Sequence, residues 1–152
     1  MHKINSGRLI LGGIIAAVIL DILEYVDNGI LLAKPWADNQ AALHAAQVST
    51  RGYIAFNLWC LAVGLIAIWL YAAIRPRFGP GPKTALISAA VVWLFGWPLQ
   101  MLAPVVMHVV PKSLALNSSL LGIPEAAIAI LAGAYLYKEE AVQADRTSQA
   151  TA

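Results

Sequence analysis

Charge is scarce in this chain. Only 12% of its 152 residues are Asp, Glu, Lys or Arg, whereas soluble domains contain about 25%. Hydrophobic residues make up 60% of the sequence, and the formal net charge is +2. So small a net charge gives no basic surface for nucleic acid. The composition therefore predicts an integral membrane protein whose first partner is the lipid bilayer, and it excludes a nucleic-acid-binding protein.

The usual signatures of cofactor and metal chemistry are also missing. Cys60 is the only cysteine, so the chain can form neither an internal disulfide nor a CxxC site. The sequence has no glycine-rich phosphate loop and no HxxxH or ExxH spacing for a metal. No histidine lies in the core of an apolar run, which disfavours a haem or electron-transfer site. We therefore expect no cofactor and name no catalytic residue.

Long apolar segments are what the sequence does contain. Four of them reach the length of about 20 residues that a spanning helix needs. They cover approximately residues 9–32, 52–74, 84–109 and 118–137. The fold class expected is all-α, with residues 1–138 forming an antiparallel four-helix bundle in the membrane. Residues 139–152 form a polar tail that we expect to be disordered.

Lys and Arg are distributed unevenly about the four predicted spans. One side carries seven of them: Lys3, Arg8, Arg75, Arg77, Lys83, Lys138 and Arg146. The other side carries three: Lys34, Arg51 and Lys112. Because basic residues are retained on the cytoplasmic side, this asymmetry predicts that both termini are cytoplasmic.

Three carboxylates interrupt the first apolar segment. Asp21, Glu24 and Asp27 lie within it, and Asn28 follows directly. An acidic side chain near the bilayer centre costs roughly 2.5–3.5 kcal/mol on insertion scales. Each of these groups therefore needs a partner, water or a proton. At about 100° per residue, Asp21, Glu24 and Asn28 fall on one stripe of the helix, together with Gly13.

Polar residues of the other spans fall at a similar depth. Glu125 and Gln100 lie in the layer of Glu24, about one helical turn outward of the midplane, and Asn57 and Arg51 lie somewhat nearer the outer surface. The inner half of every span is almost entirely apolar. These positions predict a polar pocket that opens outward and has an apolar floor. Its predicted ligand-binding residues are Glu24, Glu125, Asp21, Asn28, Gln100, Asn57 and Arg51.

Glu24 and Glu125 are the principal pair of this predicted pocket. If their side chains meet, they share one proton, or they hold a hard cation or an organic amine between them. If a metal binds, these two carboxylates are its expected ligands. The alternative is a structural role, in which protonated or Arg-paired carboxyls fix the register of two helices. For Asp27, solvation or pairing with Lys34 is the preferred interpretation.

Three stretches carry a resemblance to known proteins. They are residues 9–32, 69–85 and 124–139, with Glu24 and Glu125 in the first and last. Through these stretches the chain resembles a group of small bacterial four-span proteins of unassigned function. The resemblance implies a multi-pass protein of the bacterial inner (plasma) membrane, and it implies nothing about activity.

Three functions remain open on these residues. The first is binding or transport of a cation, an amine or a proton-coupled small solute at the outward pocket. The second is a non-catalytic membrane subunit or assembly factor, in a homo-oligomer or larger complex, whose acids pair with a partner helix. The third is a membrane-embedded enzyme that uses paired carboxylates as acid and base on a lipid-like substrate. Of these three functions, the enzyme is the one we expect least.

Overall fold

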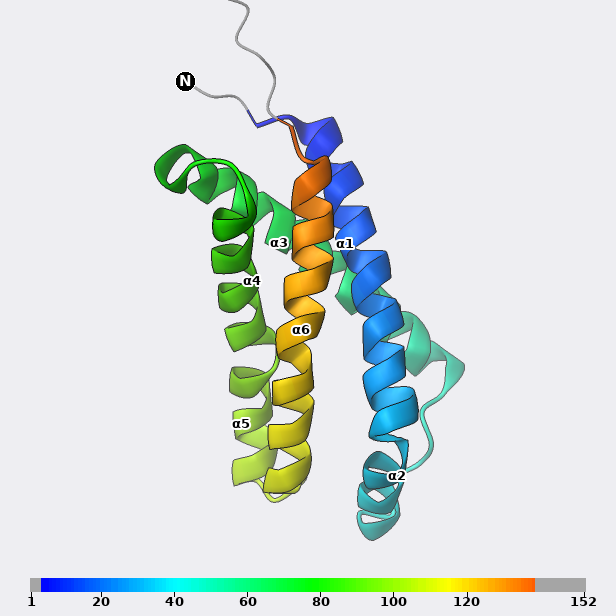
Figure 1. The fold of residues 1–152 in the computed structure, drawn as a ribbon. Coiled ribbons are helices and arrows are strands. Elements are labelled where there is room, and N and C mark those ends of the chain that lie inside the picture. The colour runs from blue at the N-terminus through cyan, green and yellow to red at the C-terminus, as the bar shows by residue number, and fades with distance from the viewer. Residues whose placement is uncertain (1–3, 139–152) are drawn as a thin grey trace, which may run out of the picture.

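The computed structural model describes residues 4–138, which contain helices and turns and no β-strand (Figure 1). The elements are α1 (Ser6–Val26), a π-helical turn (Asp27–Leu31), α2 (Ala33–Ala42), α3 (Thr50–Phe78), α4 (Pro82–Gly96), α5 (Pro98–Val106) and α6 (Lys112–Leu136). Four helical stretches are long and apolar enough to cross a membrane: Ser6–Leu31, Thr50–Phe78, Pro82–Val106 and Lys112–Leu136. The prediction of an all-α chain with four such segments is confirmed. The predicted tail, 139–152, lies outside the described residues.

Helix α1 packs against both α3 and α6, and α6 packs in turn against α4. In Figure 1, α1, α6 and α4 lie side by side, and α3 crosses behind them at an angle. Successive spans run in alternating directions. The α3–α4 turn and both ends of the described chain therefore lie together, at what we call the terminal end. Helix α2 and the α5–α6 turn lie at the opposite end, which we call the α2 end.

Small residues set the distance between α1 and its two neighbours. A Cβ atom added at Gly12 would lie 2.6 Å from the carbonyl oxygen of Gly133, so the backbones of α1 and α6 touch at this point. A Cβ atom added at Gly64 of α3 would lie 2.6 Å from the backbone nitrogen of Ala17 of α1, so the backbones of α1 and α3 also touch. Such close approach is how helices associate where lipid supplies no hydrophobic driving force.

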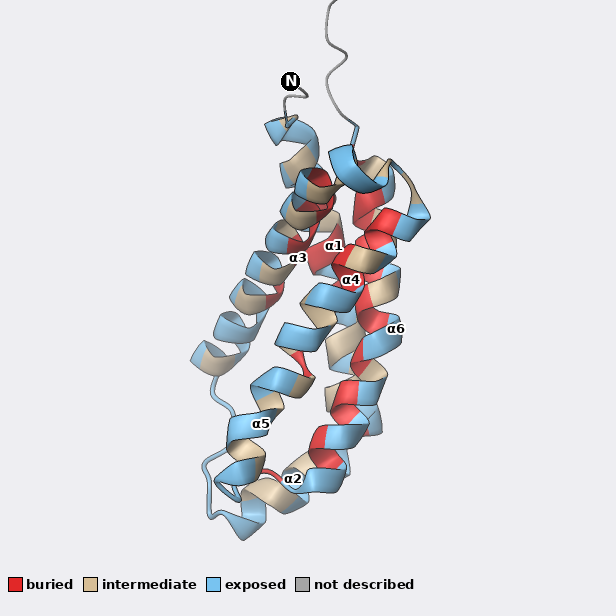
Figure 2. Cartoon of the chain, turned by 90° about the vertical axis from the view of Figure 1, so that its left-hand side faces the viewer, coloured by how far each residue is buried: buried red, intermediate tan, exposed pale blue. Residues whose placement is uncertain are grey.

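Two separate apolar clusters form the interior. The larger lies toward the terminal end and centres on the fully buried Leu20, Ile68 and Ile130. The smaller lies at the α2 end and consists of Leu32, Val110, Leu114 and Ala115, with Trp36, Met101, Val105 and Leu121 against it. Buried residues follow the contacts between helices, and exposed residues cover much of the rest of the helical surface (Figure 2). Many exposed side chains are large and apolar, as lipid-facing positions require.

Two local breaks interrupt the helices. The third predicted span, 84–109, is not one continuous helix, because it breaks at Trp97 (φ −120°, ψ −76°) between α4 and α5. Pro98 follows the break, and a proline disfavours helical geometry in the residue before it. The connection from Ala33 onward contains a helix at Ala33–Ala42, and the chain leaves helical geometry at His44, whose φ is 51°.

Candidate functional site

Glu24 and Glu125 come together across the α1–α6 interface. The carboxyl group of Glu125 lies close enough to that of Glu24 to feel its charge. Glu125 is buried, with 3% of its surface exposed, and Glu24 is half-buried. The Gly12–Gly133 contact holds α1 and α6 close together, and the two glutamates lie about two to three turns nearer the α2 end of the same helix pair. The structure therefore brings together the principal pair predicted from the sequence.

Asp27 is a third carboxylate at this position. It begins the π-helical turn and interacts with the carboxyl group of Glu125. The interpretation that Asp27 pairs with Lys34 is wrong. Lys34 Nζ lies 2.6 Å from Asp38 Oδ2 in an exposed ion pair. The physical reason is that Lys34 and Asp38 are four residues apart on α2, the spacing at which side chains of a helix meet.

Trp97 lies at the centre of the site, although the predicted pocket did not include it. Its side chain is buried and lies within reach of both Glu24 and Glu125. The ring rests on Gly122, where an added Cβ would lie 2.5 Å from the indole Nε1. Trp59 meets the ring edge-on, with centroids 5.9 Å apart. The sequence does contain a signal for Trp97. Its indole N–H is a hydrogen-bond donor, and the residue precedes Pro98 at the depth of the two glutamates.

A hydrogen-bonded chain links the site to α2. Asn28 Nδ2 donates to Glu24 Oε2, one helical turn away. Trp36 Nε1 on α2 donates to Asn28 Oδ1 at 2.9 Å. The side-chain amide of Asn28 therefore bonds to Glu24 through its Nδ2 and to Trp36 through its Oδ1. The π-helical turn that holds Asn28 is a backbone feature often found at functional sites.

Asp21 belongs to a different face of α1. Its Oδ1 accepts a hydrogen bond of 2.8 Å from Asn57 Nδ2 on α3. The pair borders a cavity of about 170 Å³ that is otherwise apolar. Asp21 and Glu24 are separated by about 60° around the helix. Because α1 lies between α3 and α6, the predicted single stripe divides, with Asp21 toward α3 and Glu24 toward α6. Buried Cys60 lies between them, near the charges of both.

The remaining two predicted residues lie apart from the pair. Arg51 is exposed in the first turn of α3 and forms no ion pair with any described residue. Gln100 is exposed on α5, and its side chain has no hydrogen bond among residues 4–138. The break at Trp97 explains Gln100, because residues after a break do not keep the rotational phase of the helix before it. Neither residue contributes to the Glu24–Glu125 pair in this conformation.

Apolar clusters close the site from both ends. The larger cluster forms the predicted apolar floor on the terminal side. The smaller cluster, around Leu32 and Leu114, lies between the carboxylates and the α2 end, where the sequence predicted an opening. Neither of the two best-formed cavities of the described chain borders Glu24 or Glu125. The site is therefore covered in this conformation.

Its charge balance limits what the site can hold. Glu125 Oε1 is buried and has no hydrogen-bond partner among the described residues. None of the described Lys or Arg side chains forms an ion pair with Glu24, Asp27 or Glu125. Among residues 4–138 there is also no group of three or more His, Cys, Asp or Glu side chains arranged for a metal ion. Charge compensation must then come from a proton or from a cation that only the two glutamates bind.

Comparison with known proteins gives no match. No protein-family model, curated protein or solved structure matches the chain. The function is therefore inferred from the geometry and chemistry of the described residues.

Proposed function

We propose that this protein is a membrane protein that binds a cation in exchange for a proton at the Glu24–Glu125 pair. In the resting state the pair holds one proton. A monovalent cation, such as an alkali-metal ion or a small amine, displaces that proton and binds both carboxylates. The net charge inside the membrane is then the same before and after exchange, which avoids the cost of an added buried charge. Such an exchange couples binding or transport of the cation to protons.

The observation that supports this proposal most is the buried, unpartnered Oε1 of Glu125 beside Glu24. Leaving a buried acceptor without a partner costs about 1–3 kcal/mol, and more for a charged group. In a purely structural pair, a Lys or Arg side chain bonded to this oxygen would have removed that cost. Intramembrane carboxylates without one are typical of ion and proton pathways.

Access to the pair is proposed from the α2 end. Trp36 and the cluster around Leu32 and Leu114 cover the site there, and α2 is held to α1 through the Trp36–Asn28 hydrogen bond. A movement of α2 would expose Glu24 while the larger apolar cluster still closed the terminal side. Opening on one side only is what a binding site or one half of an alternating-access cycle requires.

The membrane placement of the site is part of the proposal. We propose that the four spans form an antiparallel bundle in the inner membrane of a bacterium, with both termini in the cytoplasm. The excess of Lys and Arg at the terminal end supports this orientation. The site then opens toward the periplasmic side.

The test is a titration of the purified full-length chain with Na⁺, K⁺, Ca²⁺ and methylammonium in a weakly buffered detergent solution. At least one cation should raise the melting temperature and release protons at the same concentration. Saturation at 100 times Kd corresponds to about 2.7 kcal/mol of added stability. Glu24→Gln and Glu125→Gln should each abolish both responses, because a neutral amide has no proton to exchange and no negative charge to balance the cation.

The matched control is Asp38→Asn, which removes an exposed carboxylate at the α2 end. It should keep the full response. The proposal fails if no cation of the series stabilises the wild-type protein or releases protons. It fails equally if the double glutamine variant responds as the wild type does.

A second function is favoured by a separate observation, the Asp21–Asn57 hydrogen bond. This polar pair lies at the depth of the apolar spans and Asn57 is exposed, so in a lone chain it would face lipid at considerable cost. A partner helix covering it would make the protein a non-catalytic subunit or assembly factor. The test is purification in a mild detergent. A second polypeptide that is lost with Asp21→Asn and retained with Asp38→Asn supports this function.

A further inference from the structure

We infer that the groove between the α3–α4 turn and the end of α6 binds an anionic phospholipid. The groove has a volume of about 290 Å³ and lies at the terminal end, away from the Glu24–Glu125 pair. This inference is independent of the proposed function, because the two sites share no residue.

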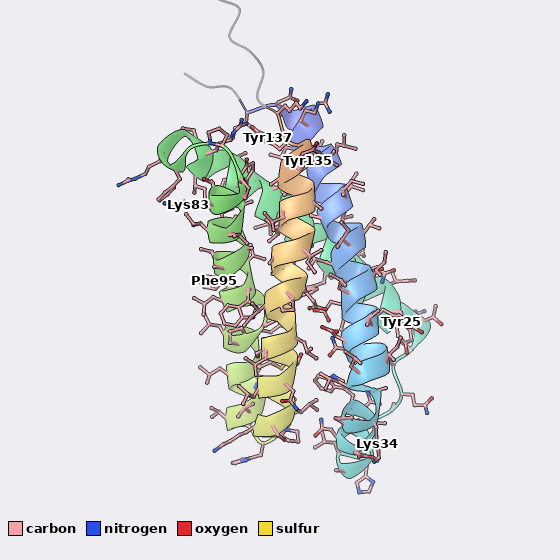
Figure 3. All side chains as sticks on the ribbon, in the orientation of Figure 1. Tyr25, Lys34, Lys83, Phe95, Tyr135 and Tyr137 are labelled. Atoms are coloured by element: carbon pink, nitrogen blue, oxygen red, sulfur yellow. The ribbon has the colours of Figure 1, made fainter. Side chains whose placement is uncertain are left out.

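The lining of the groove suits a segment of acyl chain. Its walls are Pro82, Ala85, Leu131 and Ala134, and the hydroxyl-bearing rings of Tyr71 and Tyr135 lie at its margins. Tyr135 is 84% exposed at the end of α6, where Figure 3 shows it at the same end of the molecule as Lys83. Tyrosine is enriched at this level of a membrane, where its ring meets lipid and its hydroxyl meets headgroups.

The backbone holds the groove open. Gly79 and Gly81 have positive φ values of 81° and 124°, a conformation that favours glycine. The backbone nitrogen of Gly81 donates to the Tyr71 hydroxyl at 3.2 Å, and Thr84 Oγ1 donates to the carbonyl oxygen of Gly79 at 2.6 Å. These bonds fix the turn against α3, so the groove is preformed.

The charges around the groove select an anionic headgroup. The described residues at the terminal end include five cations and no carboxylate: Arg8, Arg75, Arg77, Lys83 and Lys138. All five described acids lie from the midplane to the α2 end. Arg77 and Lys83 are exposed and flank the turn that forms one wall. A phosphate of a lipid whose chain enters the groove would lie within reach of both, and a single basic residue near such a surface strengthens binding several-fold.

The experiment uses the full-length protein in nanodiscs that mix phosphatidylcholine with phosphatidylglycerol. A photoreactive benzoylphenylalanine replaces Tyr135. Because Tyr135 is 84% exposed, this replacement should not disturb the packing of the fold. We expect the cross-link to capture phosphatidylglycerol in preference to phosphatidylcholine. The double variant Arg77→Gln/Lys83→Gln should weaken phosphatidylglycerol binding roughly 5-fold for each cation removed. Tyr135→Ala removes a ring that lines the groove without changing charge. Measured without the photoreactive group, by the phosphatidylglycerol that co-purifies with the protein, this variant should also bind less of the lipid.

The control is Lys34→Gln/Lys112→Gln, which removes two exposed cations at the α2 end. It should leave phosphatidylglycerol binding within twofold of wild type. Equal capture of the two lipids overturns the inference, as does an equal loss of binding in both double variants. A cross-link to residues 139–152 or to a second copy of the chain shows a different occupant and overturns it too. Unchanged binding in Tyr135→Ala reduces the interaction to surface charge and overturns the groove as the site.

Discussion

At the scale of single residues, the site depends on one unsatisfied atom and one ring. Glu125 Oε1 has no hydrogen-bond partner among the described residues, and Trp97, a member of the larger apolar cluster, lies within reach of both carboxylates. The ring keeps its place because Gly122 has no side chain. The position of the Trp97 ring, and with it the surroundings of the two carboxylates, therefore depends on a glycine that has no side chain.

Gly122→Ala tests this dependence. The added Cβ would lie 2.5 Å from Trp97 Nε1, so the buried ring must move. Overpacking of this kind costs about 1–3 kcal/mol. We expect lower stability in chemical unfolding and a changed Trp97 environment in near-ultraviolet circular dichroism.

The control for that variant is Gly96→Ala, on the neighbouring helix. A Cβ there has one contact, Trp59 at 3.9 Å, which is an ordinary distance. It should unfold as the wild type does to within about 0.5 kcal/mol. Equal stability of Gly122→Ala and wild type would contradict the described position of Trp97.

Residue depth was predictable from the sequence, and residue direction was only partly so. Counting along straight helices placed Glu24 and Glu125 in one layer, and they meet in the structure. The same counting placed Asp21 on the stripe of Glu24, because it could not show that α1 lies between two helices. It also missed Trp97 and misjudged Gln100, since both depend on the break before Pro98.

At the scale of elements, α2 is the part of the fold most suited to movement. It has no buried residue and is held at the site by the hydrogen bond from Trp36 to Asn28. Pro35 lies in the first turn of α2, a position that proline tolerates, so the sequence does contain a start signal for this helix. The spans themselves were predicted well, since each exceeds the length a bilayer requires.

Trp36→Phe tests the role of α2 as a cover. Phenylalanine keeps an aromatic ring and removes the indole N–H, so it deletes the bond to Asn28 Oδ1. A hydrogen bond of this kind contributes about 0.5–1.5 kcal/mol. Amide hydrogen exchange in Ala33–Ala42 should therefore accelerate roughly 2- to 10-fold, with α6 unchanged.

Trp69→Phe is the matched variant, because Trp69 is 53% exposed on α3 and lies outside the described hydrogen bonds of the site. Exchange in α2 should not change in it. If Trp36→Phe also leaves α2 exchange unchanged, α2 is held by packing and by the hydrogen bond from Asn39 Nδ2 to the carbonyl oxygen of Val109, and the proposed route of access loses its support.

At the scale of the whole molecule, the proposed orientation in the membrane rests on the distribution of charge. The terminal end carries most of the described cations and the α2 end carries the exposed Lys34–Asp38 pair. The alternating direction of the four spans is predictable from the sequence, because apolar segments of this length are expected to cross the membrane as helices. Which faces meet is not visible there, because lipid-facing and helix-facing positions are equally apolar.

Cysteine labelling tests that orientation in intact cells. In a Cys60→Ala background, Ser113→Cys at the α2 end should react with a membrane-impermeant maleimide. Ser6→Cys at the terminal end should react only after lysis, because the terminal end is proposed to be cytoplasmic. Both serines are exposed in the structure, so burial does not account for a difference. The reverse pattern would place the site on the cytoplasmic side.

The central claim is that Glu24 and Glu125 hold one exchangeable proton, and infrared spectroscopy of the full-length protein in bilayers measures it directly. At neutral pH the wild type should show the carbonyl band of a protonated carboxyl group. Glu125→Gln should abolish this band, Asp38→Asn should retain it, and saturation with a stabilising cation should remove it with proton release. A wild-type spectrum without the band, or a band lost in Asp21→Asn and retained in Glu125→Gln, would contradict the account.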